Sequence, residues 1–167
     1  MFRLDNYMEE WAVRYKGMLH TPEEPRFFRC NSEYTVDQFL QNYQDITHPV
    51  CAIVTHLEGT RDVSRNLDRP KYICLFLAYA DPDDYKAQAD AKEINKNNAD
   101  AFLAKLYYDS QLAARQDRRN PLSMVDLTNV RYDTIGPITS KGWFELAITI
   151  ESLEFTKVCY SPTDYIE

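Results

Sequence analysis

The sequence predicts an α+β domain with a mostly antiparallel sheet, which is built from two long hairpins and packs against an N-terminal helix and one long central helix. Three observations predict this fold class. The start and the middle of the chain show helical periodicity, pairs of apolar strands flank the central helix, and this order favours hairpins over crossover connections. The length of 167 residues suits one domain, so residues 1–167 are expected to share one core.

The first helix is predicted over residues 6–19, with Asp5 as its N-cap. Residues 20–31 contain two prolines and two adjacent phenylalanines, a composition that indicates a loop held in place by aromatic side chains. Thr35 and Gln38 then form a capping box, which predicts a short second helix.

Two strongly apolar strands follow at residues 50–57 and 72–80, and their composition predicts that both faces of the sheet are covered there. The connection over residues 59–71 is longer than a usual hairpin loop. It carries the main basic cluster of an acidic chain, namely Arg61, Arg65, Arg69 and Lys71. We interpret this connection as either a solvated loop or a docking loop for an acidic neighbour.

Residues 82–119 have the pattern of the long central helix. The Asp-Pro-Asp-Asp sequence at residues 81–84 favours a helix start, because the acids face the positive end of the helix dipole and proline suits the first turn. Residues 95–98 are weak helix formers, so this helix is either continuous or broken there, with Asn98 capping a second segment.

The last two strands are predicted over residues 124–132 and 143–155. The second alternates apolar and polar residues, which indicates one buried and one exposed face, and its length of roughly 40 Å would let it project beyond the core. Turn residues at 135–142 form a tip between the two strands. The aromatic tail at residues 158–167 is expected to fold back or to dock on a neighbour.

The sequence contains no recognisable catalytic or ligand motif. None of the histidines has metal-ligand spacing: these are His20, His48 and His56. His56 and Glu58 share one face of a strand, which fits either a tuned imidazole base or a polar strand end. Cys51 and Cys74 lie among apolar residues, which favours buried, reduced thiols over a redox pair. The sequence therefore predicts no catalytic, cofactor-binding or metal-binding residue, and no enzymatic activity.

The formal net charge of -7 disfavours tight binding of nucleic acid through its phosphates, but it is compatible with an acidic wall along which DNA slides. The first residues lack the pattern of a signal peptide, and every apolar run is too short to span a bilayer. Four widely spaced cysteines suit a reducing compartment. These features predict no membrane partner.

Tyrosine is over-represented, with 12 copies, and it is common at protein interfaces. The two strand connections and the aromatic tail are therefore the predicted contact surfaces. The candidate interface residues are Arg61, Arg65, Arg69, Lys71, Ile138, Lys141, Tyr160 and Tyr165.

In the order of its elements the chain resembles the tail-terminator and neck-connector subunits of tailed bacteriophages. The matching stretches are residues 5–19, 50–80, 82–119 and 124–155. The resemblance implies a structural subunit of the virion that joins copies of itself head to tail into a ring, for example a hexamer, at the end of a tail tube. Its partners would be other copies, tail-tube or connector proteins, and DNA in transient passage through a channel.

Two other functions fit the same sequence. A small-ligand-binding domain or enzyme would be a monomer or dimer with an apolar pocket near His56 or Tyr132, between sheet and helices. A monomeric adaptor of a contractile or secretion machine would use its hairpins to extend the sheet of a partner. Either protein would be cytoplasmic and reduced.

Overall fold

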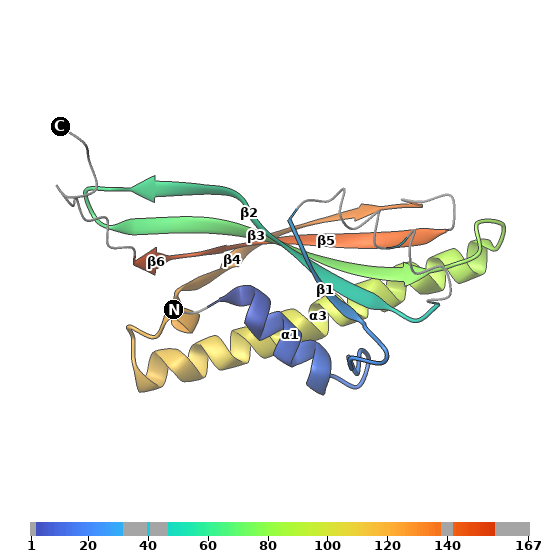
Figure 1. Ribbon diagram of the computed structural model, residues 1–167, viewed down its shortest axis with the longest axis horizontal. Helices are drawn as coiled ribbons and strands as arrows, with labels where there is room; N and C mark the ends of the chain where they lie inside the picture. Colours follow the sequence, from blue (N-terminus) through green and yellow to red (C-terminus); the bar gives the residue numbers. More distant parts are fainter. Residues whose placement is uncertain (1–2, 32–39, 41–46, 138–141, 156–167) are drawn as a thin grey trace.

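The structure is a computed structural model, and it describes residues 3–31, 40, 47–137 and 142–155. Its elements are α1 (Leu4–Arg14), β1 (Phe27–Cys30), β2 (Val50–Asp62), β3 (Leu67–Tyr79), α3 (Tyr85–Gln116), the 3-10 helix η1 (Pro121–Met124), β4 (Val125–Ile135), β5 (Trp143–Ser152) and β6 (Glu154–Phe155). The helices α1 and α3 lie on the same side of the sheet (Figure 1). This architecture confirms the predicted α+β class. The short helix predicted from Thr35 falls outside the described residues, apart from Leu40.

The sheet has the strand order β1-β2-β3-β5-β4, and β6 also pairs with β3. Neighbouring strands are antiparallel except for β1 and β2, which are parallel. The prediction of a loop throughout residues 20–31 is therefore wrong, because β1 occupies its second half. The four residues of β1 show no clear hydrophobic period, but they form a strand because the backbone of β2 pairs with them. Just before β1, the amide of Cys51 donates to the carbonyl of Arg26 at 2.8 Å.

Apolar side chains cover both faces of the central strands. On one face, Phe76 of β3 packs with Trp11 of α1 and Phe102 of α3. On the other face, Leu75 and Leu77 pack with other buried residues, a group that comprises Cys30, Leu40, Val50, Ala52, Val54 and Trp143. The prediction that both faces are covered is confirmed for this part of the sheet.

The first helix begins at Leu4 and ends at Arg14, so it is displaced towards the N-terminus relative to the predicted range of 6–19. The backbone of Tyr15 is extended, with φ -79° and ψ 125°, and this ends the helix before the apolar residues that follow. The predicted N-cap is wrong as well. Arg3 occupies the N-cap position, and Asp5 lies inside the first turn with its side chain buried.

The central helix α3 is continuous over residues 95–98, so of the two alternatives the unbroken helix is the one observed. Asn95 is buried, and its Nδ2 donates to the carbonyl oxygen of Phe144 in β5 at 2.8 Å. This tertiary hydrogen bond offsets the weak helix propensity of asparagine. The helix begins three residues later than predicted, since Asp84 is its N-cap and accepts hydrogen bonds from the amides of Lys86 and Ala87.

The last predicted strand, 143–155, is divided in the structure. β5 ends at Ser152, the amide of Leu153 donates to the carbonyl of Met124 at 3.1 Å, and β6 then pairs with β3. β4 is longer than predicted, because it continues to Ile135. The hairpin of β4 and β5 thus has strands of similar length.

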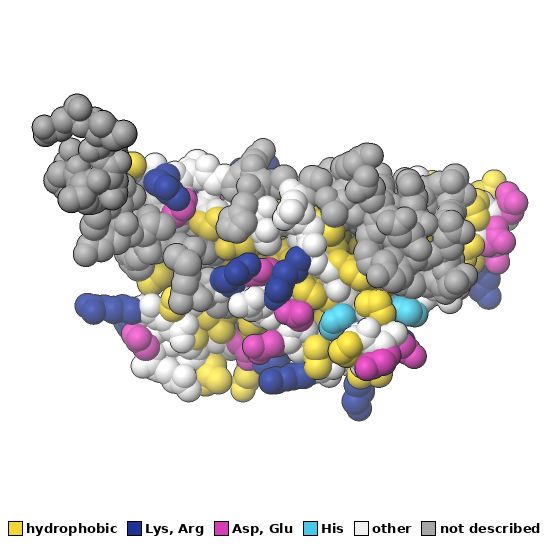
Figure 2. Space-filling model, in the orientation of Figure 1, with side chains coloured by type: hydrophobic (Ala, Val, Ile, Leu, Met, Phe, Trp, Pro, Cys, Tyr) yellow, Lys and Arg dark blue, Asp and Glu magenta, His cyan; other side chains and the backbone are white. Residues whose placement is uncertain are grey.

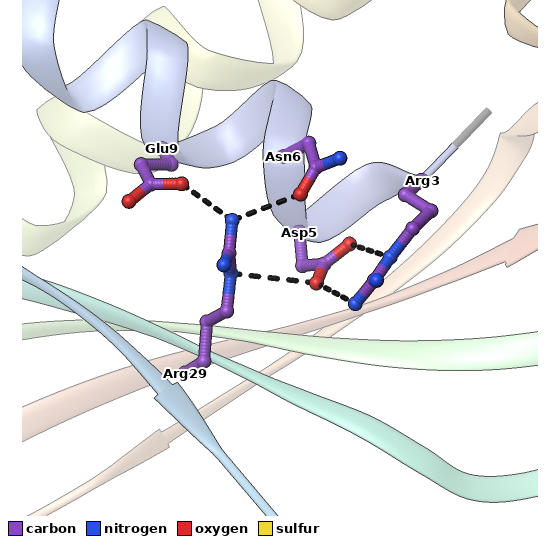
Figure 3. A network of polar contacts seen from close by, with 5 residues as sticks. All are labelled: Arg3, Asp5, Asn6, Glu9 and Arg29. Atoms are coloured by element: carbon purple, nitrogen blue, oxygen red, sulfur yellow. Dashed lines mark hydrogen bonds and ion pairs between the residues drawn. The ribbon is translucent and has the colours of Figure 1, made fainter.

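A polar network attaches α1 to the edge strand β1 (Figure 3). Asp5 accepts hydrogen bonds from Arg3 at 2.5 and 3.0 Å and forms an ion pair with Arg29 of β1 at 3.4 Å. Arg29 also contacts Asn6 at 2.9 Å and pairs with Glu9. Burial would raise the pKa of Asp5, but the hydrogen bonds and the positive charges of the two arginines outweigh it and hold the pKa below its ordinary value.

Replacing Asp5 by asparagine is expected to lower the free energy of unfolding by about 2 kcal/mol at neutral pH, because two arginines lose a buried anionic partner while remaining partly in contact with water. Since the pKa of Asp5 is lower in the folded state, its contribution is present above the unfolded pKa of about 4 and is lost as the pH falls through the folded pKa. Urea unfolding of both proteins at neutral pH and at about pH 3 measures this dependence.

The matched control is Asp100→Asn, which removes an exposed carboxylate that pairs with Lys96 within one helix turn at 3.0 Å. It should change the stability by less than about 0.5 kcal/mol. A difference between wild type and D5N that stays constant as the pH is lowered would contradict the assigned role of Asp5.

Candidate functional site

The basic cluster predicted at residues 59–71 lies on a structured hairpin end, and the prediction of a long loop there is wrong. β2 continues to Asp62 and β3 resumes at Leu67, so only four residues form the turn. Asp62 stabilises this turn by accepting hydrogen bonds from the hydroxyl of Ser64 at 2.6 Å and the amide of Arg65 at 3.1 Å. We call residues 59–71 the basic arm.

The turn also explains why β2 and β3 extend beyond the apolar segments predicted at 50–57 and 72–80. Asn66 has a positive φ of 53°, a conformation that asparagine tolerates better than most residues. Cross-strand contacts hold the polar part of the hairpin together. For example, Arg61 lies opposite Asp68 in the strand register and donates a hydrogen bond to its carboxylate at 2.7 Å. The polar ends of β2 and β3 show no hydrophobic alternation from which a strand could be predicted. They are strands because their backbones pair with each other.

The structure brings Arg61, Arg65 and Arg69 together around a hollow of about 150 Å³. Asp62 lines the same hollow and forms an ion pair with Arg65 at 3.5 Å. The arm has four basic and two acidic side chains, so it keeps a positive charge after its internal pairs are counted. This surface can attract an acidic group of a partner, as the docking-loop prediction requires.

Lys71, the fourth basic candidate, lies beside a different hollow of about 280 Å³. That hollow follows the irregular part of β4, and its lining is entirely polar: Lys71, Asp126, Asn129, Arg131, Thr149 and Glu151. Lys71 lies 4.0 Å from Glu151 on the neighbouring strand. The four predicted basic residues thus occupy one end of the sheet without forming one site.

An acidic corner lies at the opposite end of β3. It consists of Asp81, Asp83, Asp84 and Asp90, which are all exposed. Asp81 and Asp84 accept backbone hydrogen bonds that start α3, and Asp83 lies between them with its amide bonded to Asp81 at 2.9 Å. Figure 2 shows acidic side chains gathered at the right-hand end of the molecule, where α3 begins.

The basic arm and the acidic corner are separated by the length of β3. The strand has 13 residues and is therefore about 40 Å long. Because both ends of the strand belong to one rigid ladder with β2 and β5, the two charged surfaces are held at a fixed separation and point away from each other. The sequence pattern predicts the basic cluster, but for the acidic residues it predicts only a helix start.

The remaining interface candidates, Ile138, Lys141, Tyr160 and Tyr165, lie outside the described residues. They stay predictions.

A pocket of about 280 Å³ lies between α1 and α3, and Tyr132 is not among the described residues that line it. Trp11 and Tyr15 stack at 4.7 Å on one side of it, and the hydroxyl of Tyr7 donates to Asp109 at 2.7 Å. Burial, followed by the hydrogen bond and the charge of Asp109, raises the pKa of Tyr7, so its hydroxyl stays protonated at neutral pH.

His20, Cys51 and Cys74 have structural surroundings. Nδ1 of His20 accepts hydrogen bonds from the amides of Arg26 and Phe27, at 2.9 and 3.3 Å. Cys51 and Cys74 are buried, and burial raises the pKa of each thiol, so neither is a thiolate at neutral pH. The side chain of His56 lies outside the described part of the chain.

Within the described residues, no group of three or more histidine, cysteine or acidic side chains has a geometry that could hold a metal ion. No helix among them is long and apolar enough to cross a bilayer. A scan of protein-family models and a search of curated proteins found no match to this chain.

Proposed function

We propose that this protein is a structural assembly subunit that joins copies of itself head to tail into a closed ring, in the manner of tail-terminator and neck-connector subunits of tailed phages. The observation that carries the proposal is the placement of the basic arm and the acidic corner at opposite ends of β3. A subunit with complementary charges at its two ends can bind an identical subunit at each end, which is the requirement for a heterologous interface.

The proposed contact places the arm of one subunit against the start of α3 of the next. The arm offers Arg65 and Arg69, and the corner offers exposed carboxylates. These carboxylates are too far from the arm of their own chain to form ion pairs with it. Charge pairs of this kind set the register and the encounter rate of subunits more than the affinity. Tyr85, which is 85% exposed beside the acidic corner, offers apolar contact area at the same place.

Such a ring would sit at the end of a tail tube or at a head-tail junction, with tube or connector proteins as its further partners and the virion as its location. The net charge of -7 supports a channel through which DNA moves without adhering to the wall. Under this proposal the protein performs no chemistry, and its function depends on closure of the ring.

The test uses charge reversal at each end. Arg65→Glu with Arg69→Glu reverses the arm, and Asp83→Lys with Asp90→Lys reverses the corner while leaving the capping residues Asp81 and Asp84 intact. We expect the wild type to form closed rings, and each reversed variant to lose the ring because like charges then meet across the head-to-tail interface. Size exclusion with light scattering measures the masses.

An equimolar mixture of the two reversed variants should regain the wild-type mass, since each reversed end then meets an end of opposite charge. The matched control is Arg65→Lys with Arg69→Lys, which keeps the charge and should keep the ring. A wild-type protein that shows no head-to-tail association at any concentration, or reversed variants that retain the wild-type mass, would exclude the proposed contact.

The pocket between α1 and α3 favours a second candidate, a small-ligand-binding domain. Its lining offers a flat apolar surface from the stacked aromatic side chains, and it offers Lys105 and Asp109 as polar groups to orient a ligand. This function requires no ring, so the same measurement of mass separates the two candidates.

A further inference from the structure

The outer edge of β4 has no strand beside it among the residues that the structure describes. Its final segment, 131–135, keeps a regular register with β5, from Arg131 opposite Thr149 to Ile135 opposite Glu145. All five residues are exposed, including Tyr132 at 76% and Ile135 at 45%. The backbone amides and carbonyls along this edge are therefore accessible to another strand.

Proteins usually protect such an edge with proline, a bulge, inward-pointing charges or a covering element. Residues 131–135 contain no proline. The irregularity in the ladder between β4 and β5 lies between Asp126 and Arg131, so it precedes this segment and leaves it regular. The two charged residues, Arg131 and Asp133, are exposed and of opposite sign, which permits pairing with a strand that presents the reverse order.

We propose that this edge binds the same edge of a second copy of the chain, in an antiparallel pair centred on Tyr132. In an antiparallel pair about one residue, the residue before the centre lies opposite the residue after it. Arg131 of each copy then meets Asp133 of the other, and two such contacts form. The two Tyr132 side chains meet at the centre.

The faces of the sheet on which these side chains lie are consistent with the proposed pairing of two β4 edges. Arg131 and Asp133 lie opposite Thr149 and Ala147 on β5, two positions apart, so both point to the same face of the sheet. Tyr132 lies opposite Ile148, which is buried on the helical face, so the tyrosine pair forms on that side. The contact is isologous, because each copy presents the same residues to its partner. This symmetry favours a second copy over an unrelated strand.

The β4 contact does not depend on the head-to-tail ring, and it uses different residues. If both interfaces form, the twofold contact joins subunits of two rings. The two proposals can fail separately. The arm-reversed variant R65E/R69E should then have the mass of a dimer held by β4, whereas a β4 variant should have the mass of a single ring.

The test exchanges the two charges. Arg131→Asp alone, or Asp133→Arg alone, places like charges opposite each other twice in each pair and should raise the dissociation constant of the β4 contact about 30-fold. The double variant R131D/D133R restores both opposite-charge contacts and should pair as the wild type does. An equimolar mixture of R131D and D133R should also pair, because every contact between the two variants joins opposite charges.

Analytical ultracentrifugation over a range of concentrations measures these masses, on the arm-reversed background so that only the β4 contact remains. Because the substituted side chains are exposed, circular dichroism should show unchanged folding. The proposal is supported by weakened single variants, together with recovery in the double variant and in the mixture. It is overturned if the arm-reversed protein is a monomer throughout, or if both single variants pair as tightly as their parent.

Discussion

Replacing Phe102 by alanine is expected to lower the free energy of unfolding by about 4 kcal/mol. Phe102 is fully buried in α3, where it faces both α1 and the sheet. Its ring lies 5.3 Å from that of Trp11, 5.9 Å from that of Phe76 and 6.1 Å from that of Tyr7. Alanine would leave a cavity that three rigid rings from two elements, α1 and β3, cannot close. Urea denaturation, followed by tryptophan fluorescence, measures the change.

The matched control is Tyr107→Ala, which removes an aromatic ring of similar size from the same helix. Tyr107 is 57% exposed, so its removal should cost less than about 1 kcal/mol. The comparison separates the loss of core packing from any effect on helix propensity. A cost below about 1 kcal/mol for F102A would contradict the packing of α3 against the sheet between Trp11 and Phe76.

Much of this core could be predicted from the sequence, because periodicity reports which side chains share a face. Phe102 and Leu106 recur at helical spacing, and the apolar strands at 50–57 and 72–80 are too short and too β-branched or aromatic for helices. Strand pairing and helix contacts then follow from the need to bury these faces. Predictions from burial were therefore confirmed where the core is continuous.

The errors arose where a distant partner decides the local conformation. β1 and the polar half of the β2–β3 hairpin are strands because backbone groups elsewhere pair with them, and their side chains carry no apolar alternation to indicate it. Asn95 remains helical because it bonds the carbonyl of Phe144, which is 49 residues away. Such interactions leave no local pattern in one sequence.

The sequence could predict the part of the candidate site that is visible as a local excess of basic residues. Four basic residues within 59–71 stand out in an acidic chain, and the structure does place three of them around one hollow. The acidic corner could not be recognised as their counterpart, because its residues also explain the start of α3. Only the length and direction of β3 place the two groups at opposite ends of the subunit.

Replacing Gly142 by alanine is expected to lower the free energy of unfolding by about 3 kcal/mol and to distort the acidic corner. Gly142 has φ +86°, which L side chains rarely adopt. An added Cβ would lie 2.0 Å from the carbonyl oxygen of Ala80, a backbone atom that cannot move away without breaking the end of β3. The carbonyl of Gly142 also accepts a hydrogen bond from the amide of Ala80 at 2.9 Å. The unfavourable φ and the steric clash would therefore both strain the contact between Gly142 and Ala80.

Thermal and urea unfolding of G142A measure the stability, and the mass of the ring measures the effect on assembly. Gly142 also lies close to Pro82, whose Cδ would be 3.0 Å from the added Cβ, so strain at this position reaches the acidic corner directly. The control Gly59→Ala lies on the basic arm, where the nearest atom is 3.1 Å from the added Cβ, and should cost about 1 kcal/mol or less. If G142A were as stable as G59A, the close contact between the start of β5 and the end of β3 would be wrong. If it lost stability while the ring persisted, either the acidic corner would tolerate displacement or the arm would bind elsewhere.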